Sequence, residues 1–225
     1  MRVTAVILAA GRGERMRGTE NKAFLFVAGR PLLAHTLHTF VRSPRVDEIV
    51  VVVRPGEEAR IEALLPEAEK PVSVAPGGDV RRDSAIAGVE AARGEIVLIH
   101  DGARPFPSEA LIDRIVRGTV DCGACVPVLP VVDTLRPIDG DRLGSRPIDR
   151  GGLARMQTPQ GFRRSLILRA LPLAPREVTD DAGAVLALGE EVSTVPGEAT
   201  NLKVTVPEDL PLAEAIVERL RRDSR

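Results

Sequence analysis

The fold is decided by residues 3–16, which read VTAVILAAGRGERM. The run from Val3 to Leu8 is apolar and β-branched almost throughout, which is typical of a strand buried on both faces of a parallel sheet. The small residues and glycines that follow allow backbone N–H groups to approach a polyphosphate, and Arg15 adds a positive charge. We therefore expect an α/β fold whose first strand leads into a phosphate-binding loop.

The rest of the chain continues this alternation of strands and helices. Further apolar runs bounded by Gly and Pro predict buried strands over residues 48–53, 72–75, 96–99 and 124–132. Helical spacing of apolar residues predicts helices that begin at Pro31, extend over 57–65 and 80–92, and begin again at Pro207. The order predicts a doubly wound, mostly parallel sheet of the Rossmann-like kind, in one domain over residues 1–225, with ligands at the carboxyl ends of the strands.

Residues 136–150 interrupt this pattern. The segment is polar, and Asp139-Gly140 is a turn signal between two short strand-like stretches. We expect a protruding β-arm. A polar arm buries little on its own domain, so these residues alone leave open whether it is a mobile loop or clasps another subunit.

Charge and the N-terminal residues exclude two classes of partner. The chain has 31 Lys and Arg against 32 Asp and Glu, a net charge of −1, so it lacks the basic excess of a nucleic-acid-binding protein. The apolar run near the N-terminus ends at charged residues after Ala10 and is too short to span a membrane or serve as an export signal. We therefore expect no membrane partner and a cytoplasmic location.

Two familiar phosphate loops do not match residues 9–16. A dinucleotide fingerprint would need a third glycine where Met16 stands and an acidic residue after the second strand, where Arg54 stands. A Walker loop would need Gly-Lys-Ser or Gly-Lys-Thr, which is missing. On these residues alone, a plain tight turn remains the alternative to a phosphate site.

Three later segments carry further candidate chemistry. Gly77-Gly78-Asp79 with Ser84 either caps a helix or forms a wall for a nucleotide base. Asp101 follows a buried strand, where it is either a solvated turn residue or a ligand for Mg²⁺. Lys203 precedes the last helix and is either a solvated surface charge or a phosphate ligand. The chain has only three lysines, so two of them in candidate phosphate sites favour the functional interpretation.

Taken together, these segments resemble the sugar-nucleotidyltransferase superfamily and, within it, the methylerythritol-phosphate cytidylyltransferase family of the non-mevalonate isoprenoid pathway. The resemblance extends from Ala5 to about Ala213. Two departures are visible: Gly102 stands where alanine is common, and Asp181 where glutamate is common. The matching elements are the Ala-Ala-Gly-x-Gly-x-Arg-Met loop with Lys22, Gly77-Gly78-Asp79 with Ser84, His100 to Pro105, Asp133-Thr134, Asp149-Arg150, Thr158-Pro159-Gln160, Thr179-Asp180 and Asn201 to Thr205.

The resemblance implies a role for each matching residue. Arg15, Lys22 and Lys203 would be catalytic, with Lys203 facing the α-phosphate, and Asp101 would bind Mg²⁺. The residues implied to bind CTP are Ala9, Ala10, Gly11, Gly13, Arg15, Lys22, Gly77, Asp79, Ser84 and Ala103. Those implied to surround the acceptor, methylerythritol phosphate, are Arg104, Thr134, Arg150, Thr158 and Thr179.

The implied activity is magnesium-dependent transfer of a cytidylyl group from CTP to methylerythritol phosphate, with release of pyrophosphate. The resemblance also implies a homodimer in which the arm clasps a second subunit. A cytidylyltransferase for another polyol phosphate, such as ribitol 5-phosphate, would share nearly every nucleotide-binding residue and differ around Thr134 and Arg150. A non-catalytic nucleotide-binding regulator would not need the complete set Lys22, Asp101 and Lys203.

Overall fold

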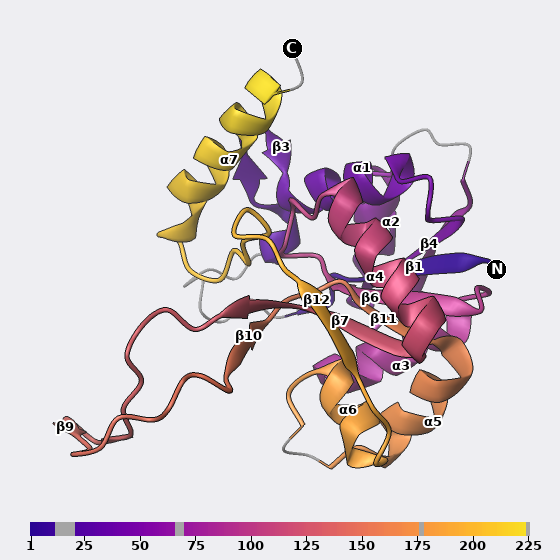
Figure 1. Cartoon of the computed structure of the whole chain (residues 1–225). Coiled ribbons are helices and arrows are strands. Elements are labelled where there is room, and N and C mark those ends of the chain that lie inside the picture. Colours follow the sequence, from indigo (N-terminus) through magenta and orange to yellow (C-terminus); the bar gives the residue numbers. More distant parts are fainter. Residues whose placement is uncertain (12–20, 66–69, 176–177, 224–225) are drawn as a thin grey trace.

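The computed structural model describes residues 1–11, 21–65, 70–175 and 178–223, and Figure 1 shows its arrangement. Strands and helices alternate along most of the chain, as expected. The elements in chain order are β1 (Val3–Leu8), the 3₁₀ helix η2 (Lys22–Phe24), β2 (Phe26–Val27), β3 (Arg30–Pro31), α1 (Leu32–Arg42), β4 (Glu48–Val53), α2 (Glu58–Glu62), β5 (Val72–Pro76), α3 (Arg81–Ala91), β6 (Ile96–Asp101), α4 (Glu109–Cys122), β7 (Ala124–Pro130), β8 (Ile138–Asp139), β9 (Arg142–Leu143), β10 (Ala154–Met156), β11 (Gln160–Arg163), α5 (Arg164–Leu173), α6 (Asp181–Ala187), β12 (Ser193–Pro196) and α7 (Asp209–Asp223).

The central sheet is mostly parallel, which confirms the predicted fold class. Its strand order is β10-β7-β11-β6-β1-β4-β5, and β12 pairs in parallel with β7. The strands β5, β4, β1 and β6 are all parallel. The short strand β11 lies antiparallel between β6 and β7 and joins the two halves of the sheet.

The two faces of the sheet are covered by different helices. On β1, Ala5 and Ile7 pack into a cluster with α1, α2 and α4, whereas Val6 packs into a second cluster with α3, α5 and α6. All three side chains are fully buried. Because both faces of the sheet are buried, the strand sequences are continuous apolar runs rather than alternating apolar and polar residues.

The parallel register brings several loops to one edge of the sheet. Leu8, the last residue of β1, pairs with Asp101 of β6 on one side and with Val52 of β4 on the other. The chain therefore leaves β1, β4 and β6 at neighbouring points. A crevice at the carboxyl ends of such strands is the usual place for ligands in doubly wound sheets.

The C-terminal segment reaches the same edge through a third apolar cluster. Val204 is fully buried against residues of α7 and Ala103, and its N–H donates to the carbonyl of Ala103 at 2.9 Å. This backbone contact places Lys203 beside the end of β6. It explains how Asp101 and Lys203, 102 positions apart in sequence, share one site.

The predicted arm is confirmed as a structural feature. The strands β8 and β9 pair antiparallel, and Leu135 and Ile148 form an isolated bridge at its base. Figure 1 shows the arm extending away from the sheet and its helices. Ile138 and Leu143 are each 70% exposed, so the arm presents apolar side chains that its own chain does not cover.

Several boundaries differ from the predicted ones. Pro31 is the residue before α1 and pairs in β3, so the helix begins at Leu32. The second helix covers Glu58–Glu62 rather than 57–65, the strand predicted to end at residue 132 ends at Pro130, and the last helix begins at Asp209. Each difference is of one to three residues at an end, where local sequence constrains the backbone least.

Candidate functional site

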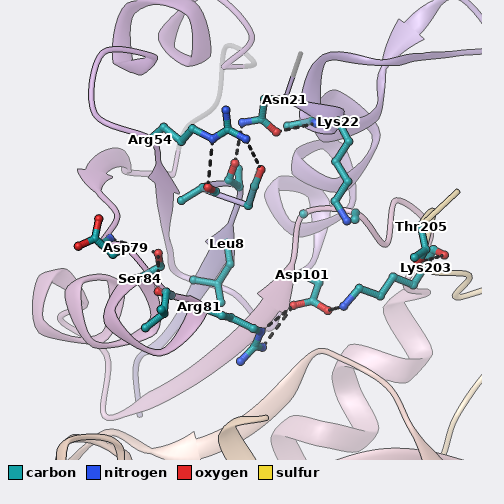
Figure 2. A pocket seen from close by; sticks show the side chains of 18 of the residues that line it. Leu8, Asn21, Lys22, Arg54, Asp79, Arg81, Ser84, Asp101, Lys203 and Thr205 are labelled. Atoms are coloured by element: carbon teal, nitrogen blue, oxygen red, sulfur yellow. Dashed lines mark hydrogen bonds and ion pairs between the residues drawn. The ribbon is translucent and has the colours of Figure 1, made fainter. Parts of the chain in front are cut away.

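A cavity of about 690 Å³ lies at the carboxyl ends of β1, β4 and β6. It is bounded by the loop after β1, the N-terminus of α3 and the segment that carries Lys203, as Figure 2 shows. Nine residues with predicted roles line it together: Ala9, Ala10, Gly11, Lys22, Asp79, Ser84, Asp101, Ala103 and Lys203. Segments far apart in sequence therefore meet around one hollow.

Side chains from two other segments hold the carbonyl groups of the glycine loop. The amide of Asn21 donates to the carbonyl of Ala9 at 2.8 Å. The guanidinium of Arg54 donates to the carbonyls of Ala10 at 3.3 Å and Gly11 at 2.7 Å. Donors on these carbonyl oxygens reduce the repulsion that a polyphosphate would meet at the loop.

Asn21 also connects the loop to Lys22. Its side-chain oxygen accepts a hydrogen bond from the N–H of Ala23 at 3.0 Å and caps η2, the helix in which Lys22 is the first residue. The side-chain nitrogen of Asn21 also donates to a carboxylate oxygen of Glu57 at 2.7 Å, which fixes the orientation of the amide. Figure 2 shows the Lys22 side chain extending from η2 into the cavity.

The turn from β5 to α3 forms another wall of the cavity. A Cβ atom on Gly77 would lie 2.6 Å from Cβ of Ala10 and 2.8 Å from Oγ of Ser84, so only glycine allows this close approach to the loop. The N–H of Gly78 donates to Oγ of Ser84 at 3.2 Å, which shapes the turn. Asp79 is exposed at its tip.

Asp101 lies between two positive charges. Its Oδ2 accepts from Nζ of Lys203 at 2.6 Å, and its Oδ1 accepts from Nε and Nη2 of Arg81 at 3.3 Å each. Burial alone would raise the pKa of Asp101, but the charges of Arg81 and Lys203 outweigh it and hold the pKa well below the usual range. Asp101 is therefore an ionised carboxylate at neutral pH.

Arg81 is itself held by a second carboxylate. Its Nη1 and Nη2 donate to the two oxygens of Asp181 at 2.9 and 2.8 Å. Burial would lower the pKa of Arg81, but Asp181 and Asp101 raise it well above the ordinary value. Burial raises the pKa of Asp181, although its contact with Arg81 favours the ionised form. The side chains of Lys203, Asp101, Arg81 and Asp181 form one continuous network.

The donor set can be compared with the needs of a metal ion. No cluster of three or more His, Cys, Asp or Glu side chains suited to a metal occurs in the described part of the chain. Mg²⁺, however, commonly takes one or two carboxylates and completes its shell with phosphate oxygens and water. An ionised Asp101 beside a phosphate loop fits that pattern.

The five residues predicted to surround the acceptor do not line this cavity. Thr134 and Arg150 are exposed at the base of the arm, where the Arg150 side chain donates to the carbonyl of Val132. Thr179 is exposed beside α6, and Arg104 donates from Nη1 to the carbonyl of Asn201 at 2.8 Å. Their shared role stays a prediction.

Thr158, the fifth of them, is buried and joins a chain of hydrogen bonds behind Asp101. Because Nε2 of His100 must donate to the carbonyl of Arg104, at 2.8 Å, its Nδ1 accepts from the Thr158 hydroxyl at 3.1 Å. The hydroxyl oxygen in turn accepts from the N–H of Asp101 at 3.1 Å. Thr158 thus fixes the backbone that carries Asp101.

The remaining site residues stand outside these contacts. Gly77 abuts the cavity without lining it. Gly13 and Arg15 lie outside the described residues, so their predicted contacts with the triphosphate stay predictions. Sequence reasoning gave no role to Asn21, Arg54 or Arg81, although each touches a predicted site residue.

The buried imidazole of His100 predicts that the fold weakens in mild acid. Burial lowers the pKa of His100 from 6.5 to about 4. Between these pH values the unfolded chain binds a proton that the native state excludes, so the free energy of unfolding should fall by up to roughly 3 kcal/mol as the pH decreases. Urea unfolding at a series of pH values measures this slope.

A variant separates His100 from other acid-sensitive groups. His100→Gln keeps a donor for the carbonyl of Arg104 but cannot titrate, so its stability should depend less on pH across that interval. His38→Gln, at an exposed position of α1, is the comparison variant. Burial also lowers the pKa of His38, but less than that of the fully buried His100, so this change should reduce the slope less than His100→Gln does. Equal slopes in wild type and His100→Gln would contradict the assignment.

No helix in the described ranges is long and apolar enough to cross a membrane.

Comparison with known proteins assigns the family. The family model described as "IspD: 2-C-methyl-D-erythritol 4-phosphate cytidylyltransferase" matches residues 3–219. The 2-C-methyl-D-erythritol 4-phosphate cytidylyltransferase of Geobacillus kaustophilus is 43% identical over 223 residues, covering 96% of this chain and 97% of the relative. That of Frankia casuarinae is 42% identical and covers 97% of this chain and 82% of the relative.

Solved structures agree with this result. The crystal structure of the enzyme of the same name from Thermus thermophilus is 40% identical, has a TM-score of 0.79 and covers 95% of this chain and 98% of its own. The 4-diphosphocytidyl-2C-methyl-D-erythritol synthase of Anaerococcus prevotii is 32% identical, has a TM-score of 0.83 and covers 96% and 98%. These matches extend over nearly the whole chain, and we conclude that it belongs to the 2-C-methyl-D-erythritol 4-phosphate cytidylyltransferase family.

Proposed function

We propose that this protein transfers the cytidylyl group of CTP to 2-C-methyl-D-erythritol 4-phosphate, giving 4-diphosphocytidyl-2-C-methyl-D-erythritol and pyrophosphate, in isoprenoid precursor biosynthesis. The family assignment supports the reaction. The observation that carries the proposal is the convergence of Lys22, Asp101 and Lys203 on one cavity beside a glycine loop. A protein that only bound a nucleotide would not need all three.

The cavity suggests how CTP is seated. The triphosphate lies along the backbone of residues 9–11 and contacts Lys22. Gly13 and Arg15, which lie outside the described residues, complete its binding site in this proposal. The cytidine lies against the turn formed by Gly77, Asp79 and Ser84, and against Ala103. We place the α-phosphate, which joins these two parts of CTP, beside Lys203 and Asp101, which line the same cavity.

We assign Asp101 as the protein ligand of a magnesium ion. Its ionised carboxylate and its position beside the end of β1, where the glycine loop begins, support this assignment. Its Oδ1 accepts two bonds from Arg81, whereas its Oδ2 accepts one from Lys203 and keeps a second lone-pair position for the ion. When bound, Mg²⁺ neutralises phosphate charge and orients the triphosphate.

The reaction is an in-line displacement at the α-phosphorus. An oxygen of the acceptor phosphate forms a bond to this phosphorus while the bond to the bridging oxygen of the β-phosphate breaks, and pyrophosphate leaves. The attacking group is already anionic because the second pKa of a phosphomonoester is about 6, so no side chain has to remove a proton.

The side chains therefore act through charge and position. Lys203 donates to the α-phosphoryl oxygens, on which charge develops, and Lys22 and Arg15 stabilise the departing pyrophosphate. Lys203 pairs with Asp101 in the absence of substrate. We propose that its ammonium exchanges that partner for the α-phosphate when CTP binds.

A pyrophosphate-release screen tests the proposed function. CTP, UTP, ATP and GTP are each combined with methylerythritol phosphate, ribitol 5-phosphate and erythritol 4-phosphate, with and without Mg²⁺. We expect the highest kcat/KM for CTP with methylerythritol phosphate, and only with the metal. Faster release with ribitol 5-phosphate would overturn the acceptor assignment, and no release with any pair would overturn the activity.

We further propose that the acceptor site is completed by a second subunit. Thr134 and Arg150 stand on the arm, away from the cavity, and the arm exposes Ile138 and Leu143. Exposed apolar side chains on a projecting segment are typical of an interaction surface. In a homodimer, the arm of one subunit brings Thr134 and Arg150 to the partner's Arg104 and Thr179.

We predict that the double variant Ile138→Asp/Leu143→Asp, which changes both exposed apolar residues of the arm, dissociates the dimer. Charges placed in an apolar interface should raise the dimer dissociation constant at least about tenfold, and the KM for methylerythritol phosphate should rise while the KM for CTP stays unchanged. Sedimentation equilibrium and steady-state kinetics measure these quantities. Leu173→Asp, at an exposed position of α5, is the control. A monomeric wild type, or a variant that stays dimeric, would contradict the proposal.

Two broader assignments complete the proposal. We assign residues 1–225 to a single nucleotidyltransferase domain, because the central sheet includes both the first strand of the chain, β1, and the last, β12. We place the activity in the cytoplasm, because highly charged substrates such as CTP do not cross a hydrocarbon layer unaided.

A further inference from the structure

Arg81 occupies an unusual position between two carboxylates. It is the first residue of α3, where the helix dipole disfavours a cation. Its guanidinium nevertheless lies in the wall of the cavity and contacts Asp101 of β6 and Asp181 of α6. The two carboxylates offset both the dipole and the loss of water around the charge.

The contacts of Arg81 are unequal. Both oxygens of Asp181 accept short bonds of 2.9 and 2.8 Å, the paired geometry in which an Arg–carboxylate contact is strongest. Asp101 accepts only longer bonds of 3.3 Å, both at Oδ1. Asp181 is 1% exposed and begins a helix, so it is the fixed end of the network. Asp101 is the group that Arg81 orients.

The other oxygen of Asp101 accepts from Lys203, a contact that the proposed mechanism breaks. In the proposed mechanism Lys203 turns from Asp101 to the α-phosphate. The Asp101 carboxylate would then lose its 2.6 Å contact and keep only Arg81 among the side chains that hydrogen-bond to its oxygens in the described residues. A carboxylate held from one side keeps its orientation and leaves its other oxygen open to a metal ion.

We infer that Arg81, anchored by Asp181, is a positioning residue that holds the Asp101 carboxylate in its metal-binding orientation while Lys203 changes partner. The inference rests on the proposed function. The same pair ties Asp101 to the start of α6, next to Thr179 of the proposed acceptor site. An ion pair with a purely structural role would affect stability alone.

Metal binding distinguishes the two roles. The free Mn²⁺ signal in electron paramagnetic resonance reports the affinity of the protein for Mn²⁺ in the presence of α,β-methylene-CTP, which cannot be cleaved. Arg81→Met should weaken Mn²⁺ binding by about 10–100-fold, the usual effect of losing a group that orients a metal ligand. With Mg²⁺, kcat should fall by a similar factor while the KM for CTP changes little.

Matched variants complete the test. Arg82→Met removes the neighbouring arginine, which donates to the carbonyl of Ala174 away from the cavity, and should leave Mn²⁺ affinity and kcat unchanged. Asp181→Asn should also weaken Mn²⁺ binding. The double variant with Arg81→Met should bind Mn²⁺ little more weakly than Arg81→Met alone, because both changes break the same contact between Arg81 and Asp181. Should Arg81→Met not fold, Arg81→Lys keeps the charge without the paired geometry and should still weaken Mn²⁺ binding.

The outcomes separate the inference from the proposed function. An Arg81→Met or Arg81→Lys protein with wild-type Mn²⁺ affinity and kcat, and only a lower melting temperature, would overturn the positioning role. Absence of pyrophosphate release by the wild type would overturn the proposed function. The Mn²⁺ measurement does not require turnover and would still report on Arg81.

Discussion

Replacing Lys203 with alanine is expected to lower kcat by about 10²–10³, the usual cost of removing one donor that stabilises charge in the transition state. Lys203 is the positive group that the fold of the C-terminal segment brings to the end of β6, where its Nζ lies 2.6 Å from Asp101. A neutral side chain there leaves the charge that develops on the α-phosphoryl oxygens without this partner. Pyrophosphate release at saturating CTP and methylerythritol phosphate measures kcat.

The fold should survive this change. The backbone bond from Val204 to Ala103 positions the segment without the lysine side chain, and Arg81 remains beside Asp101. Lys70→Ala is a matched control, because the Lys70 ammonium donates to the carbonyl of Ser43 and does not line the cavity. Wild-type kcat in Lys203→Ala would remove Lys203 from the mechanism.

Replacing Asp101 with asparagine is expected to cost at least as much in kcat, about 10² or more, and also to destabilise the fold. An amide oxygen is a poorer ligand for Mg²⁺ than a carboxylate. The change also leaves Arg81 and Lys203 facing each other without the buried negative charge between them. Removing one partner from a fully buried ion pair typically costs about 3–5 kcal/mol. Because the side chains of Arg81 and Lys203 are 33% and 35% exposed, the loss here should be smaller, and urea should unfold the variant at a somewhat lower concentration than the wild type.

The two effects of Asp101→Asn can be measured separately. Steady-state kinetics over a range of Mg²⁺ concentrations should show a lower kcat and a weaker apparent affinity for the metal. Asp113→Asn removes a carboxylate that pairs with Arg45 and Arg117 elsewhere on the molecule, and it should change neither quantity. An Asp101→Asn protein with wild-type kcat and unchanged metal dependence would exclude Asp101 as the magnesium ligand.

The strands of the parallel half of the sheet were predictable from local sequence. Val3–Leu8 and Glu48–Val53 have the predicted bounds, because a strand covered on both faces needs an unbroken apolar run. The strand β11 was not predicted. It is short and partly polar, reading QGFR, and its place between β6 and β7 depends on partners that are distant in sequence.

The helix α4 was also not predicted, although its sequence carries clear signals. Ser108 caps its N-terminus by accepting from the N–H of Leu111, and Gly123 ends it with a φ of 87°. Between them, Leu111, Ile115 and Thr119 recur on one buried face. These are the start, stop and period of an ordinary amphipathic helix.

The nucleotide side of the site was largely predictable, and its supporting residues were not. Their positions in the sequence singled out Lys22, Asp101 and Lys203, and family likeness gave them their roles; all three line one cavity. Arg81 escaped notice because arginine is abundant in this chain and no local pattern marks a residue whose partner, Asp181, lies 100 positions later. The residues predicted to surround the acceptor do not meet within one chain, and local sequence patterns do not show whether a second subunit brings them together.

The most direct test of this mechanism is a crystal structure of the protein with α,β-methylene-CTP and Mg²⁺. We predict the triphosphate along the backbone of residues 9–11, the metal about 2.0–2.1 Å from a carboxylate oxygen of Asp101, and Nζ of Lys203 within hydrogen-bond distance of the α-phosphate. A nucleotide bound elsewhere, or Lys203 still paired with Asp101 and directed away from the α-phosphate, would contradict it.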